Sequence, residues 1–195
     1  SGSGKSTIAK ALAVALGIEY LDTGAMYRGV TFEVLKRALE ATDVEAVARV
    51  ARTIHFVQTR DSLQVNGVDA TAAIRTAEVD AAVSHVAANS AVREEMRSRQ
   101  RQWIADHGGG VVEGRDIGSV VFPEAEVKVF LTASVDERAR RRHAELAARG
   151  ERVDLRAIRD DVERRDHADS SRAASPLVVA DGAVVVDTTG MGIDE

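Results

Sequence analysis

The sequence SGSGKST at residues 1–7 matches the end of the phosphate-loop pattern G-x-x-x-x-G-K-[ST]. Gly2 and Gly4 have no Cβ, so backbone N–H groups can approach a phosphate closely, and the positive end of a following helix favours the same anion. The apolar period over residues 8–16, which ends at Gly17, is typical of such a helix. The stretch therefore predicts a nucleoside-triphosphate site. A flexible Gly/Ser-rich leader is the alternative, but it does not account for G-K-S-T before a helix.

The phosphate loop also predicts its own ligands. Lys5 is expected to reach the β- and γ-phosphates, and the Ser6 hydroxyl stands where such sites hold Mg²⁺. ATP and Mg²⁺ are therefore the expected cofactors. The residues expected to contact ATP are Ser1, Gly2, Ser3, Gly4, Lys5, Ser6 and Thr7.

Composition narrows the class of protein. A chain of 195 residues suits one α/β body with insertions. The absence of cysteine excludes disulfides and cysteine-bound zinc and is typical of a cytoplasmic protein, and no apolar run is long enough to span a membrane. The net charge of −5 argues against nucleic-acid binding. Basic residues are mostly Arg, which suits phosphate binding, although a codon bias of the genome would explain the surface arginines equally well.

Strands that alternate with helices predict a parallel sheet covered on both faces, as in the three-layer P-loop α/β sandwich. A hairpin interrupts this order and reads as part of an insertion. The expected strands are 18–21, 111–116, 127–131 and 184–186, and the hairpin pairs 54–58 with 63–66. The expected helices are about 25–40, 42–52, two within 71–107, 135–149 and 155–166, with a polar segment at 169–172.

Charged residues mark where chemistry is expected. Arg28 lies in the first turn of its expected helix, where a cation opposes the helix dipole, so it hints at an anionic ligand; a solvated Arg is the alternative. The strand from residue 111 ends on charged residues, and ligands of open α/β sheets lie beyond such strand ends.

Arginines of residues 137–172 suggest a mobile lid over two phosphates. The alternative, a solvated helical pair with ion pairs, is preferred for arginines 140, 149, 156 and 159.

Several of these segments together resemble the bacterial cytidylate kinase family of nucleoside monophosphate kinases. The similarity spans nearly the whole chain, and the most specific stretches are LDTGAMYR at 21–28 and GRDIGSVVFP at 114–123. Further matching stretches are the phosphate loop, IRTAEV at 74–79, Ser84 with Val92-Arg93, and residues 164–177. The resemblance implies transfer of the ATP γ-phosphoryl group to CMP or dCMP.

The resemblance also implies a site, position by position. Lys5, Arg165 and Arg172 match residues that act in transfer. Positions that hold the CMP phosphate match Arg28, Arg115 and Arg172; base contacts match Ser84, Arg93 and Asp116; sugar contacts match Arg165 and Asp169; and Thr23, where serine is common, lines the pocket. Glu113 stands where the family usually has Asp. From the residues alone, Asp116 could instead only pair with Arg115 to set the loop.

The expected organisation is one P-loop kinase domain over residues 1–195, trimmed at both ends, with an inserted CMP-binding subdomain at 54–88 and a lid at 149–172. We expect a cytoplasmic monomer that binds a small-molecule substrate and neither nucleic acid nor membrane. Two other functions stay open: a P-loop kinase for a different small acceptor, and a nucleotide-binding switch that is not a kinase.

Overall fold

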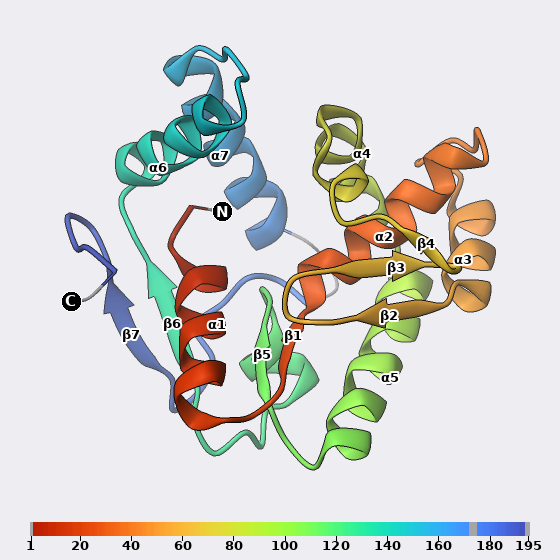
Figure 1. The fold of residues 1–195 in the computed structure, drawn as a ribbon, viewed down its shortest axis with the longest axis horizontal. Helices are drawn as coiled ribbons and strands as arrows, with labels where there is room; N and C mark the ends of the chain where they lie inside the picture. Colours follow the sequence, from red (N-terminus) through yellow and green to blue (C-terminus); the bar gives the residue numbers. More distant parts are fainter. Residues whose placement is uncertain (1, 172–174, 194–195) are drawn as a thin grey trace. The chain divides into compact units, whose positions relative to one another are not determined.

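The computed structural model describes residues 2–171 and 175–193 and divides into two compact units. Unit 1 consists of Ser1–Ile8 with Arg115–Glu195, and unit 2 is Ala9–Gly114. Each unit combines helices with a two-stranded parallel sheet, as the α/β class predicts (Figure 1). The elements are α1 (Lys5–Leu16), β1 (Tyr20–Asp22), α2 (Thr23–Lys36), α3 (Val44–Thr53), β2 (Phe56–Gln58), β3 (Leu63–Val65), β4 (Val68–Asp69), η1 (Ala73–Arg75), α4 (Ala77–Ala88), α5 (Ser90–His107), β5 (Val111–Glu113), η2 (Ile117–Val121), β6 (Val129–Thr132), α6 (Val135–Ala148), α7 (Leu155–Ser171) and β7 (Val184–Asp187).

The parallel pair β1–β5 organises unit 2. Tyr20 is opposite Val111 and Asp22 is opposite Glu113, so both strands end at the same edge of the sheet. The α1 residues Ala9 and Ala13 pack on Tyr20 and Val111. Because ligands of such sheets lie beyond the carboxyl ends of the strands, the Asp22–Glu113 edge is where functional groups are expected.

A large apolar core joins α2, α3, α4 and α5 of unit 2 to its antiparallel sheet. Its buried residues include Val30 and Val34 of α2, Val47 of α3 and Leu63 of β3. Gly29 makes the close approach possible, because a Cβ at this position would lie 2.7 Å from Phe56 Cε1. Burial of so many apolar side chains is the main source of stability for this unit.

Side-chain caps fix where two of these helices begin. Asp43 accepts from the backbone N–H of Ala46 at 2.9 Å, and Asn89 accepts from Ala91 N at 3.1 Å. Asp and Asn can do this because their side-chain oxygens satisfy N–H groups that the first helical turn leaves without partners.

Unit 1 contains the parallel pair β6–β7 and the helices α6 and α7, which lie side by side (Figure 1). The helices share a small apolar cluster in which Ala139, Ile158 and Val162 are buried and Val135 and Leu146 are half-buried. Among the described residues, none of the helices in either unit has the length and apolar character of a membrane span.

Some boundaries differ from the sequence prediction. Helix α2 begins at Thr23 instead of Ala25, because Asp22 caps it, and it ends at Lys36. Strand β6 begins at Val129, and Val127 is 79 % exposed. Helix α7 continues to Ser171 through residues expected to form a polar segment. The hairpin β2–β3 is confirmed, and β4 extends it to a three-stranded sheet that the sequence prediction missed.

Candidate active site

The phosphate loop of unit 1 turns sharply into α1. Gly2 has φ +78° and Gly4 has φ +85°, values that favour glycine, and the helix begins at Lys5. Ile8 N donates to Gly4 O at 3.0 Å, which closes the first helical turn. Lys5 Nζ donates to Ser3 Oγ at 3.5 Å, so the ammonium group lies over the loop. This arrangement of glycines, helix start and lysine is suited to binding phosphate.

Neighbouring elements of unit 1 hold the loop in place. A Cβ at Gly2 would lie 2.7 Å from the backbone oxygen of Arg138, so α6 packs directly against the loop. Thr188, just after β7, has its Oγ1 3.3 Å from Ser3 O and 3.1 Å from Thr132 O, and Ser3 is 4 % exposed. Any larger residue at position 2 would displace the loop from α6.

The residues near the loop fit a magnesium ion that is held largely by phosphates. Ser6 lies in the first turn of α1 with its side chain exposed. Within residues 2–171 and 175–193 no group of three His, Cys, Asp or Glu side chains could hold a metal ion by itself. In phosphate-loop sites the Ser/Thr hydroxyl that follows the Lys binds Mg²⁺ together with substrate phosphates, and Ser6 has this position.

In unit 2, Thr23 and Glu113 connect the ends of β1 and β5. Thr23 Oγ1 donates to Glu113 O at 2.7 Å, and Thr23 is 3 % exposed. The Tyr20 hydroxyl donates to the Glu113 carboxylate. Burial, together with the negative charges of Asp22 and Glu113, raises the pKa of Tyr20 above its ordinary value, so the phenol stays protonated. The Glu113 carboxylate thus has a structural partner, which the sequence reasoning did not foresee.

Arg28 is held by two groups of unit 2. Its Nη2 lies 2.6 Å from Asp80 Oδ1, and its Nη1 donates to Ile74 O at 3.0 Å. Because α2 begins at Thr23, Arg28 is in the second helical turn, and the expectation that its charge opposes the dipole of the first turn was wrong. The alternative of a simple solvated surface Arg is also wrong, since its side chain is only 21 % exposed.

The two base-contact candidates of unit 2 differ in burial. Arg93 is 3 % exposed, and its Nη1 donates to Ala87 O at 3.1 Å. Its guanidinium carbon lies 5.6 Å from the centre of the Tyr27 ring, within cation–π range. Ser84 is exposed on α4. A buried guanidinium fixed by a carbonyl and an aromatic ring is oriented well enough to recognise a planar ligand.

The acceptor candidates of unit 1 follow β5 and continue on α7. Arg115 Nη1 lies 2.7 Å from Asp169 Oδ2, which brings a predicted phosphate ligand beside a predicted sugar ligand. Asp116 is 8 % exposed, and its backbone oxygen accepts from Val120 N at 2.9 Å where η2 begins. Arg165 Nε lies 3.0 Å from Asp161 Oδ2. Of the other predicted site residues, Ser1 and Arg172 lie outside the described residues.

The arginines of α6 and α7 fall into two kinds. The preferred alternative, a solvated pair of helices with ion pairs, is confirmed for Arg140, Arg149 and Arg159, which pair with Glu137, Glu145 and Glu163. Arg138 is different, because it is 9 % exposed, lies against the phosphate loop and pairs through both terminal nitrogens with Asp166.

The pairing with Arg138 changes the pKa of Asp166. Burial by itself would raise the pKa of Asp166, but the hydrogen bonds and charge of Arg138 outweigh burial and lower it. The pair ties α7 to the first turn of α6, the same turn that contacts Gly2. The sequence reasoning grouped Arg138 with the other arginines, since nothing in the spacing distinguishes it.

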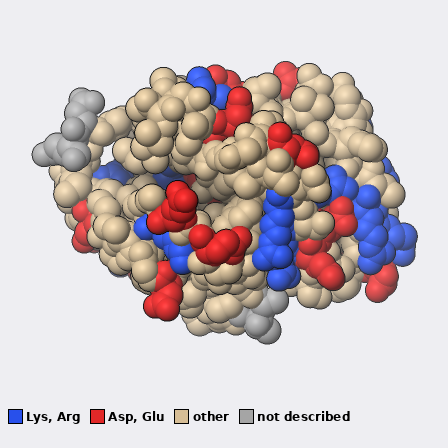
Figure 2. All heavy atoms as spheres, turned by 90° about the horizontal axis from the view of Figure 1, so that it is seen from below, with Lys and Arg blue, Asp and Glu red and all other residues tan. Residues whose placement is uncertain are grey.

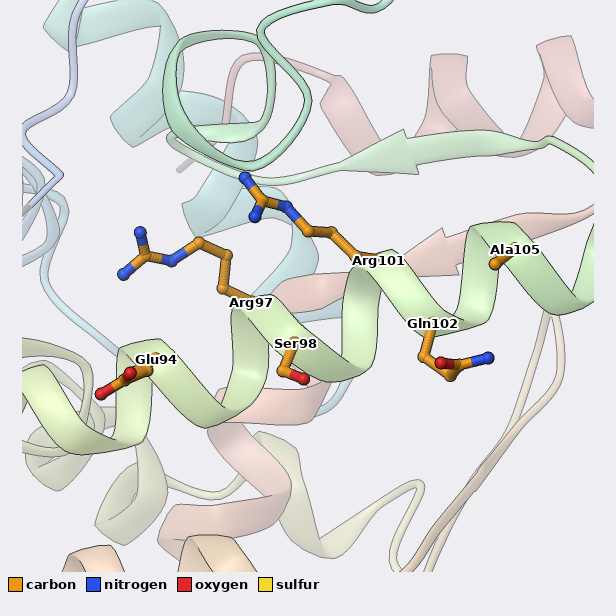
Figure 3. A pocket seen from close by; sticks show the side chains of 6 residues that line it. All are labelled: Glu94, Arg97, Ser98, Arg101, Gln102 and Ala105. Atoms are coloured by element: carbon orange, nitrogen blue, oxygen red, sulfur yellow. The ribbon is translucent and has the colours of Figure 1, made fainter.

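The surface of unit 2 also has a hollow of about 550 Å³ on α5. Arg97 and Arg101 extend to the same side of the helix (Figure 3). The hollow is lined by Glu94, Arg97, Ser98, Arg101, Gln102 and Ala105, and none of these is a predicted site residue.

Charges of both signs are interspersed over the face of the described residues in Figure 2. Lys and Arg lie among Asp and Glu there.

The comparisons with known proteins bear on the whole chain. A family profile described as "Cytidylate kinase" matches residues 1–195. A "Cytidylate kinase" of Anoxybacillus flavithermus is 46 % identical over 202 residues, with 100 % of this chain and 88 % of the relative covered. A "Cytidylate kinase" of Mycolicibacterium paratuberculosis is 48 % identical over 195 residues, which cover 98 % and 86 % of the two chains. A "Bifunctional pantoate ligase/cytidylate kinase" of a Synechococcus strain is 48 % identical over 201 residues, 39 % of its length. With the phosphate loop in place and parallel sheets in both units, the resemblance seen in the sequence is confirmed: the chain belongs to the cytidylate kinase family and has its P-loop α/β fold.

Proposed function

We propose that the protein transfers the γ-phosphoryl group of ATP to the 5′-phosphate of CMP or dCMP. The observation that carries this proposal is the family match over residues 1–195, together with full-length relatives that bear the cytidylate kinase name. In the reaction, a phosphate oxygen of CMP attacks the γ-phosphorus. The bond from the γ-phosphorus to the bridging oxygen breaks, and ADP leaves with that electron pair.

The donor side uses the phosphate loop. The backbone N–H groups of residues 2–7 and the start of α1 bind the β- and γ-phosphates, and Lys5 adds a positive charge where negative charge shifts during transfer. Mg²⁺, with the Ser6 hydroxyl among its ligands, supplies charge neutralisation when bound. No protein base is required, because a phosphate dianion is already a nucleophile.

The acceptor side is assigned to residues of each unit. In unit 2, Arg28 binds the CMP phosphate, Ser84 and Arg93 contact the base, and Thr23 lines the pocket. In unit 1, Arg115 and Arg172 bind the phosphate, Asp116 contacts the base, and Arg165 and Asp169 contact the sugar; Arg165 and Arg172 also neutralise the moving charge. The geometry of Arg28 and Arg93 supports these roles, because both guanidinium groups are oriented by protein oxygens before any ligand binds.

Base recognition follows from hydrogen-bond chemistry. Cytosine presents an amino donor at C4 and an acceptor at N3, whereas uracil presents an acceptor and a donor at the same places. A carboxylate from Asp116 and a guanidinium from Arg93 match cytosine only. Each is buried, at 8 % and 3 % exposure, so a mismatch would leave two desolvated charges unsatisfied. We therefore infer strong selection of CMP over UMP.

The same proposal includes the organisation of the chain. Residues 54–88 form the CMP-binding subdomain, and residues 149–172 form a lid that closes during transfer. The protein acts as a cytoplasmic monomer.

A coupled assay for ADP, run with and without CMP, tests the proposal. ADP should form rapidly only when CMP or dCMP is present, and CDP should appear in equal amount. Rapid ADP formation with a different small acceptor would indicate the alternative kinase. Slow ADP formation that is independent of any acceptor would indicate a nucleotide-binding switch.

A further inference from the structure

We propose that Asp80 is a positioning residue for the acceptor phosphate, which it serves by holding the guanidinium group of Arg28 in a binding orientation. This inference rests on the proposed function, because it takes Arg28 to be a ligand of the CMP phosphate. It adds a residue that no sequence motif marked.

The geometry around Arg28 is that of a clamped side chain. Asp80 Oδ1 lies 2.6 Å from Nη2, and Ile74 O accepts from Nη1 at 3.0 Å. The Asp80 and Arg28 side chains are only 17 % and 21 % exposed. Two acceptors on different nitrogens fix the plane of the guanidinium group as well as its position.

Both acceptors are themselves fixed. Ile74 is buried in the apolar core, and its N–H donates to Ala70 O at 2.9 Å, so its carbonyl cannot move freely. Asp80 lies in the first turn of α4, where its own N–H donates to Thr76 O at 3.0 Å and where a carboxylate suits the helix dipole. Arg28 is therefore oriented against two rigid groups of unit 2.

An Arg side chain has five N–H donors, and these two bonds use one hydrogen on each terminal nitrogen. Donors remain on Nε and on both terminal nitrogens, so a phosphate can bind without breaking the pair. Because the side chain is already ordered, phosphate binding avoids the cost of immobilising it. Asp80 thus raises acceptor affinity without contacting the acceptor.

Two variants separate this role from a simple effect of charge. Asp80→Asn and Asp80→Ala both remove the negative charge, but only Asn keeps an oxygen that can accept from Nη2. We expect the Ala variant to bind CMP about fivefold more weakly than the Asn variant, because the Arg28 side chain, no longer held, must be immobilised when CMP binds. Glu78→Gln, in the same turn of α4 and exposed, is the matched control for charge and should bind CMP as the wild type does.

Calorimetry of the full chain with CMP measures this difference, and inhibition by cytidine, which has no phosphate, is the second readout. Cytidine should bind both Asp80 variants equally, because only the phosphate contact depends on Arg28. Equal CMP affinity in the two variants would overturn the proposal, and so would a loss that is as large for cytidine as for CMP. Asp80→Ser, whose hydroxyl is too short to reach Arg28, replaces the Ala variant if that variant does not fold.

The experiment also separates the two levels of inference. If the wild type forms no ADP in response to CMP, the proposed function fails. If the wild type is active and Arg28→Ala weakens CMP binding, but the two Asp80 variants do not differ, only the role of Asp80 fails.

Discussion

The two units support their arginines in different ways. In unit 2, Arg93 is held by a backbone carbonyl and Arg28 by a backbone carbonyl and the Asp80 carboxylate, and the surrounding helices and strands share a large apolar core. In unit 1, the helices α6 and α7 share an apolar cluster of only three buried residues among those described, and Arg138 is held by the Ala133 carbonyl and the Asp166 carboxylate. A core keeps its strength over a wide range of pH, whereas an ion pair depends on the charge of its carboxylate.

The difference suggests a division of labour between the units. In unit 2, the large apolar core is costly to distort, and it supports the groups that are expected to select the base and bind the acceptor phosphate. The helices of unit 1, where arginines are expected to respond to a transferring phosphate, depend more on charge. Segments with few buried apolar contacts open at low free energy, which is the property that a closing lid requires.

The phosphate loop provides the strongest test of this division. Lys5→Ala should lower kcat by roughly 10³-fold, because a charge aimed at the transferring group is lost. CMP affinity, measured by calorimetry, should stay close to that of the wild type, since the acceptor arginines are other residues. Lys10→Ala, further along α1 where Lys10 pairs with Asp61, is the control and should leave kcat nearly unchanged. A parallel loss of CMP affinity in Lys5→Ala would show that donor and acceptor groups are not separate.

The apolar core of unit 2 predicts the second largest effect, a loss of stability. Leu63 is 2 % exposed in the core, so Leu63→Ala should lower the free energy of unfolding by about 2–5 kcal/mol. Val57→Ala on the neighbouring strand is the control, because Val57 is 58 % exposed and its truncation should cost under about 0.5 kcal/mol. Denaturant titration measures both. Similar losses in the two variants would contradict the view that this core carries the stability of unit 2.

Base selection tests the role proposed for Asp116, a carboxylate of unit 1 that is 8 % exposed. Asp116→Asn should narrow the preference for CMP over UMP about tenfold, since an amide can offer N–H to the O4 of uracil; a polar site of this kind can reject an analogue by as much as roughly 10⁴. The measurement is kcat/KM for both nucleotides on the wild type and the variant. Equal weakening of both substrates would mean that Asp116 only shapes the loop after β5.

The ion pair of unit 1 predicts the smallest effect and a pH dependence. Asp166→Asn should cost about 1 kcal/mol at neutral pH. Because the pKa of Asp166 is lowered in the folded state, this stability is present above the ordinary carboxyl pKa and is lost as the pH falls through the lowered value. The stabilities of wild type and variant, measured by thermal unfolding, should therefore converge in acid. Asp136→Asn, at a site 75 % exposed, is the control and should have little effect at any pH.

Much of the fold follows from local chemistry that is visible in the sequence. Asp43 and Asn89 are good caps in front of apolar periods, and both begin helices. The missed strand β4 had a signal too: Asn66 and Gly67 have positive φ, and Asn-Gly is a strong hairpin turn. The continuation of α7 to Ser171 had no such signal, because Asp169-Ser170-Ser171 has low helix propensity and is helical only through its context.

Only part of the candidate site could be predicted from the sequence. The phosphate loop could be recognised from its glycines and Lys5, because the chemistry dictates the spacing. The partners of the arginines could not, since Asp80 and Arg28 are far apart in sequence and an Asp in a first helical turn is commonplace. The same holds for Arg138, whose special position depends on the packing of α6 against Gly2.

The bond from Thr23 Oγ1 to the Glu113 carbonyl determines which ligand atoms this side chain can serve. A hydroxyl group has a single hydrogen. The hydrogen of Thr23 Oγ1 is already donated to Glu113 O, which lies 2.7 Å away. Only lone pairs remain, and they repel the oxygens of a phosphate dianion. The side chain therefore suits a donor such as a sugar hydroxyl or a guanidinium group. Serine would serve equally well at this position, whereas valine, of nearly the same shape, would lose the hydrogen bond to the Glu113 carbonyl and offer a ligand no lone pair.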